Sequence, residues 1–127
     1  MRRKIYIFLT FTYAFLILVF SSLPKLSSIE KPGIDKVEHA IEYSILGFLL
    51  LSCFKRRNGL TVIVVFIFAS IYGVFDEFHQ YFIPGRDCSG LDMIADSFGS
   101  LFGILLKIRA DRKTKKYSFN TESLSSA

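Results

Sequence analysis

The chain has 127 residues, of which 51% are hydrophobic and 16% aromatic, and its mean hydropathy is +0.41. A soluble domain this short has too much surface for its volume to bury so much apolar material. With three prolines, eight glycines and two cysteines, the composition also excludes a disordered linker, a collagen-like repeat and a disulfide scaffold. It favours a membrane protein.

The net charge is +5, and basic and acidic residues gather in different segments of the chain. Twelve of the sixteen basic residues fall in three clusters, at 2–4, 55–57 and 107–116, with long apolar runs between them. Nine of the eleven acidic residues lie in or beside the other two connections. This alternation is the positive-inside pattern of membrane proteins, and it argues against nucleic-acid binding. We therefore expect a lipid bilayer, and not a nucleic acid, as a partner.

In chain order, four apolar stretches predict four membrane-spanning helices, at 5–23, 37–54, 60–80 and 91–108. The first has no charged residue. It also resembles a signal peptide, but it is long for one and lacks an Ala-x-Ala cleavage pattern, so a retained helix is favoured. The basic clusters place both termini and the 55–59 turn in the cytoplasm, with the 24–36 and 81–90 loops outside.

The predicted architecture is therefore all-α and polytopic. We expect a single membrane domain at 1–112 and a disordered cytoplasmic tail at 113–127, which is rich in Ser and Lys. Cys53 and Cys88 fall on opposite sides of the bilayer in this topology, which excludes a disulfide between them.

Polar residues intrude into the second, third and fourth predicted helices. Such residues are costly in a bilayer and usually face the interior of a helix bundle or a wet cavity. At 100° per residue, each helix gathers them on one face. The second helix has Asp35, His39, Glu42, Tyr43 and Leu46 on this face, the third has Ala69, Gly73, Asp76 and Gln80 with Glu77 beside them, and the fourth has Asp92, Asp96, Gly99 and Gly103.

Each face is polar toward the outside and apolar toward the cytoplasm, so the sequence predicts a mostly acidic, outward-facing pocket that is closed below. A channel or a proton relay would need polar residues along its whole length. Gly99 and Gly103 would let a neighbouring backbone approach closely. Arg86, in the loop after the third helix, either holds an anionic ligand or pairs with Asp92 or Glu77.

These residues form three ordered motifs, Asp35-Lys36-x-x-His39-x-x-x-Tyr43, Gly73-x-x-Asp76-Glu77-x-x-Gln80 and Pro84-x-Arg86-x-x-Ser89-x-x-Asp92. The pattern resembles the VanZ-like family over about residues 5–108. The resemblance implies a small integral protein of the bacterial cell membrane, in a family whose named member is associated with low-level resistance to the glycopeptide teicoplanin. Asp96 departs from the family, which usually has Asn there; it adds a charge to the pocket unless its carboxyl is protonated.

Three functions stay open at this stage. The pocket binds a lipid head group or cell-wall precursor, it catalyses a reaction on a lipid-linked substrate, or its polar residues only join the helices. Candidate catalytic residues are His39 and Asp35, as an acid–base pair, and Glu77. Candidate ligand-binding residues are Lys36, Tyr43, Asp76, Gln80, Arg86, Ser89, Asp92 and Asp96.

Four of these acids (Asp76, Glu77, Asp92 and Asp96) could together hold a divalent cation. We expect His39 within hydrogen-bonding or one-water reach of Glu77 or Asp92. The sequence leaves the cofactor, the metal and the oligomeric state unknown.

Overall fold

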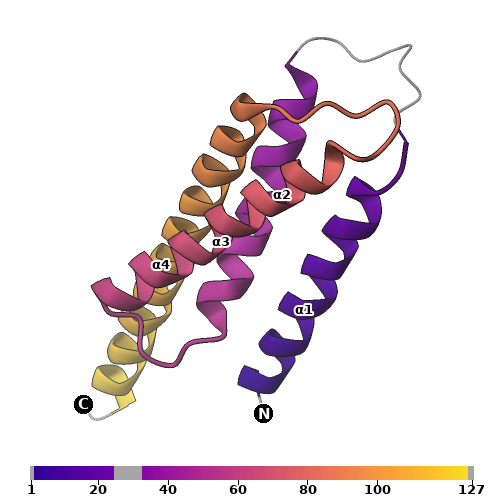
Figure 1. Cartoon of the computed structure of the whole chain (residues 1–127). Coiled ribbons are helices and arrows are strands. Elements are labelled where there is room, and N and C mark those ends of the chain that lie inside the picture. Colours follow the sequence, from indigo (N-terminus) through magenta and orange to yellow (C-terminus); the bar gives the residue numbers. More distant parts are fainter. Residues whose placement is uncertain (1, 25–32, 126–127) are drawn as a thin grey trace.

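A computed structural model describes residues 2–24 and 33–125. The prediction of an all-α chain is confirmed over these residues, which form four helices and no strand. The helices are α1 (Arg2–Ser21), α2 (Ile34–Ser52), α3 (Gly59–Gln80) and α4 (Gly90–Ser125). Both ends of the chain and the α2–α3 connection lie at one end of the bundle, and the α3–α4 connection lies at the other (Figure 1).

Helix α4 extends well beyond its predicted end at residue 108. It continues to Ser125, where the sequence led us to expect a disordered tail from Lys113. Neither Gly nor Pro follows Gly103, and extending a helix that already exists is far easier than starting one. Asp111 also pairs with Arg57 and with Lys107 Nζ at 3.1 Å. The prediction for 126–127, and that for most of the 24–36 loop, fall outside the described residues.

The closest packing in the bundle is between α2 and α4, and glycines make it possible. A Cβ added at Gly99 would lie 2.8 Å from Ala40 Cα, and one added at Gly103 would lie 2.6 Å from the Ser44 carbonyl carbon. Real Cβ atoms essentially never come within 3.0 Å of another heavy atom. The predicted close approach of a neighbouring backbone is therefore confirmed, and the neighbour is α2.

The distribution of side chains is inverted relative to a soluble protein. Among the described residues, 32 large hydrophobic side chains are exposed, whereas seven hydrophobic and eleven polar or charged residues are buried. Two helices, α1 and α3, are long and apolar enough to cross a membrane by length and composition, and less than a quarter of the apolar window of each is buried. An apolar exterior over a polar interior favours an apolar medium around the bundle.

Candidate functional site

A polar cavity of about 70 Å³ lies at the end of the bundle that holds the α3–α4 connection. It is formed by the end of α1, the first turns of α2, the end of α3 and the loop that follows. Its lining residues are Phe20, Ser21, Glu38, His39, Glu42, Asp76, Gln80 and Arg86. Three of the eight are carboxylic acids (Glu38, Glu42 and Asp76), beside one histidine and one arginine.

His39 is the centre of a buried network beside this cavity, and 5% of it is exposed. Its Nδ1 lies 2.9 Å from Asp96 Oδ1, and its Nε2 lies 3.6 Å from Glu77 Oε1. The predicted proximity of His39 to carboxylates of the third and fourth helices is confirmed. The hydrogen-bond partner is Asp96, one turn beyond the expected Asp92, because the close contacts of Gly99 with Ala40 and of Gly103 with Ser44 fix the register of α2 against α4.

Asp92 pairs instead with Lys36, whose Nζ lies 3.1 Å from Asp92 Oδ1. This pair joins the first turns of α2 and α4, and neither residue lines the cavity. The expectation that Lys36 and Asp92 contact a ligand there therefore finds no support in the geometry. Asp35 is half-buried in the first turn of α2, and the hydrogen bond of His39 Nδ1 goes to Asp96.

Arg86 lines the cavity, but the structure gives its guanidinium other partners than the Asp92 or Glu77 expected from the sequence. It donates to the backbone carbonyls of Phe20, at 3.0 Å, and Leu23, at 3.3 Å. It also donates to Gln80 Oε1 at 3.3 Å. The ion-pair alternative is wrong, because Arg86 is directed toward the end of α1, where main-chain carbonyls accept its N–H groups.

The three remaining predicted residues occupy different positions. Gln80 Nε2 donates to Asp76 Oδ2 at 3.0 Å within the cavity wall. The backbone N–H of Ser89 donates to Glu77 Oε2 at 2.9 Å, so Ser89 holds Glu77 in place through its main chain. Tyr43 is fully buried against the ring of Tyr72, outside the cavity lining.

Several buried oxygens of this network have no hydrogen-bond partner among the described residues. They include Asp76 Oδ1, Glu77 Oε1, Asp96 Oδ2 and the Tyr43 hydroxyl. A network that only joins helices would be expected to satisfy its own polar atoms, since an unpaired buried oxygen costs about 1–3 kcal/mol. The unpaired atoms therefore favour a proton, a water molecule, an ion or a ligand at this position.

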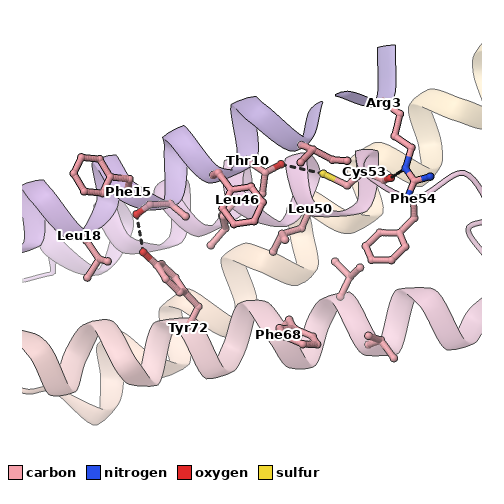
Figure 2. Close-up of a pocket in the computed structure, with 15 residues that line it drawn as sticks. Arg3, Thr10, Phe15, Leu18, Leu46, Leu50, Cys53, Phe54, Phe68 and Tyr72 are labelled. Carbon is pink, nitrogen blue, oxygen red and sulfur yellow. Dashed lines mark hydrogen bonds between the residues drawn. The ribbon is translucent and has the colours of Figure 1, made fainter. Parts of the chain in front are cut away.

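Directly below the cavity, α1, α2 and α3 enclose an apolar groove of about 720 Å³ (Figure 2). Its lining includes Phe15 and Leu18 of α1, Leu46 and Leu50 of α2, and Phe68 and Tyr72 of α3. The groove and the cavity are adjacent along all three helices. On each helix, a groove residue lies one turn from a cavity residue: Leu18 from Ser21, Leu46 from Glu42, and Tyr72 from Asp76.

Sequence reasoning missed the groove and the contribution of α1 to the cavity. An apolar run shows no face by itself, so Phe15 and Leu18 could not be separated from the rest of α1. One signal was present: Ser21 and Ser22 interrupt the apolar pattern where α1 ends. Glu38 also lines the cavity, although the 100° spacing put other residues of α2 on the polar face.

A sequence model described as VanZ/LLP1 matches residues 2–110. The match includes α1, α2, α3 and α4 up to Ala110, and so it contains every residue that lines the cavity or the groove. No curated protein and no solved structure matches the chain.

Proposed function

Because the chain belongs to the VanZ/LLP1 family, we propose that it is a bacterial membrane protein that binds a lipid-linked ligand of the cell envelope. The polar cavity takes part of the ligand's head group, and the apolar groove takes its chain. The observation that carries this proposal is the succession of cavity and groove on the same three helices.

All four helices span the membrane in this proposal, with both termini in the cytoplasm. The distribution of positive charge supports it. The basic clusters at 2–4, 55–57 and 107–116 belong to the end of the bundle opposite the cavity. Positive charge is retained on the cytoplasmic side, so the cavity faces outward, toward the cell wall.

The two volumes restrict the ligand. A cavity of about 70 Å³ holds about two water molecules, each taking about 30 Å³, so it admits a small polar group and not a whole head group. The groove is about ten times larger and lined by apolar side chains. A long apolar chain with a compact polar group at its end fits both. Binding of such a precursor would limit how much of it teicoplanin can reach. This effect would account for the association of the family with teicoplanin resistance.

The groove is tested with a photoreactive phosphatidylglycerol as the probe, in vesicles of phosphatidylglycerol that contain the full chain. Val64 lines the groove and is 37% exposed, whereas its neighbour Ile63 is 56% exposed and lies outside the lining. We expect Val64→Trp to reduce labelling of groove residues at least fivefold and to increase teicoplanin susceptibility. Ile63→Trp, the matched control, should leave both near the native level. Equal labelling in the two variants contradicts the proposal.

A second candidate function is acid–base catalysis on the same ligand. It is favoured by His39, whose Nδ1 is held by Asp96 while Nε2 faces Glu77, the arrangement of a general base with an orienting carboxylate. His39→Ala separates the alternatives. Retained labelling and thermal stability with lost teicoplanin resistance favours catalysis, whereas lost stability favours a network that only joins helices.

A further inference from the structure

We propose that His39 and Glu77, oriented by Asp96, bind one divalent transition-metal ion. The inference goes beyond the proposed ligand and does not depend on it. It starts from three buried residues on three different helices. One possible ligand atom from each of the three lies within 4.8 Å of the other two.

The separation of His39 Nε2 and Glu77 Oε1 is the first argument. At 3.6 Å it is too long for a hydrogen bond between a ring nitrogen and a carboxylate. Two ligands of one metal, each about 2.1 Å from it at an angle of about 110°, lie about 3.4 Å apart. The two atoms are therefore placed as neighbouring ligands of one ion would be, with small adjustment.

The second argument is that Glu77 Oε1 lacks another partner. Glu77 is fully buried, its Oε2 is held by the backbone N–H of Ser89, and Oε1 has no hydrogen-bond partner among the described residues. The carboxylate is thus fixed through one oxygen and directs the other at the imidazole. Such an oxygen is stabilised by a cation at this position.

Asp96 supplies the third argument, because it sets the orientation of the ring. When Nδ1 donates its proton to Asp96 Oδ1, Nε2 carries the lone pair and faces Glu77. Metal-binding histidines usually donate their second ring N–H to such a carboxylate. An ionised Asp96 can only accept this hydrogen bond, and it then places the ring proton on Nδ1.

Charge balance points to a cation as well. Three carboxyl groups are at most 1% exposed: those of Asp76, Glu77 and Asp96. Among the described residues, the basic side chain that contacts them is His39, which lies beside Glu77 and Asp96. A divalent ion would offset two of the three negative charges. A nitrogen ligand with carboxylate oxygens suits Mn²⁺ or Zn²⁺.

The test measures binding of Mn²⁺ alone to the full chain in detergent, after removal of metals with a chelator. Electron paramagnetic resonance of free Mn²⁺ should show that one ion per chain is bound. Glu77→Gln should weaken binding at least tenfold, and Asp96→Asn, which keeps an oxygen for Nδ1–H, should weaken it by about 10–100-fold. Asp92→Asn removes a buried acid that pairs with Lys36, and should change affinity less than threefold.

A second readout separates a metal ligand from a merely structural acid. Mn²⁺ should raise the melting temperature of the native chain and leave that of Glu77→Gln unchanged. The proposal is overturned if the native chain binds neither Mn²⁺ nor Zn²⁺. In that case, His39 would serve as a protonated bridge between the carboxylates of Asp96 and Glu77. Equal Mn²⁺ affinity of native chain and Glu77→Gln also overturns it. No lipid enters this experiment, so its failure is distinguishable from that of the proposed ligand.

Discussion

Gly99→Ala should separate α2 from α4 at the level of the buried network. The new Cβ would lie 2.8 Å from Ala40 Cα and closer still to the Ala40 carbonyl oxygen, and ordinary contacts begin near 3.4 Å, so the α2 backbone must withdraw by more than about 0.6 Å. Ala40 follows His39 directly. The same shift would stretch the 2.9 Å bond between His39 Nδ1 and Asp96 Oδ1 beyond about 3.5 Å, the limit of a hydrogen bond.

Overpacking of this kind costs about 1–3 kcal/mol, and the weakened hydrogen bond adds to it. We therefore expect Gly99→Ala to lower the melting temperature in detergent clearly, and to reduce teicoplanin resistance. Gly59→Ala is the matched control, because a Cβ at Gly59, in the first turn of α3, meets no atom within 4 Å. If Gly99→Ala is as stable as Gly59→Ala, the contact between α2 and α4 does not hold the network together.

Three further predictions concern the topology and the attachment of α1. In single-cysteine chains, an impermeant thiol reagent should label Cys88 in intact cells and should not label a cysteine placed at Asn58; the reverse result overturns the topology. Arg86→Ala should cost about 1–3 kcal/mol of stability in thermal unfolding, and Arg86→Lys should cost most of that amount, because an ammonium cannot reach all three acceptors of the guanidinium. Native stability in Arg86→Lys contradicts this. Tyr72→Phe removes a 2.6 Å bond to the Ala14 carbonyl and should cost about 0.5–1.5 kcal/mol; an unchanged melting temperature refutes it.

The sequence predicted the polar side of the site better than its apolar side. Polar residues in an apolar helix stand out, and their 100° spacing placed His39, Asp76 and Asp96 on faces that are buried in the structure. Which carboxylate meets His39 depends on the axial register of α2 against α4, which the glycines set. A periodicity within one helix contains no information on that register, so Asp92 was expected where Asp96 lies.

The partners of Arg86 and the groove could not be predicted for a related reason. Arg86 donates to main-chain carbonyls at the end of α1, and every residue has such a carbonyl, so no side-chain pattern indicates the contact. The groove exists because α1 stands apart from α3, with Tyr72 reaching across to Ala14. That separation is a property of how three helices pack, and none of the three sequences shows it alone.

The pairing of α2 with α4 has a consequence for synthesis of the chain. The first turns of α2 contain Asp35, Lys36, Glu38, His39 and Glu42, and partners of two of them lie on α4. These partners, Asp92 and Asp96, lie 56 and 57 residues later in the chain, so they leave the ribosome after the whole of α2. In the proposed topology, α2 is thus the helix that enters the bilayer least readily by itself, and its stable integration follows the arrival of α4. The chain then reaches its final topology as a unit, and not one helix at a time.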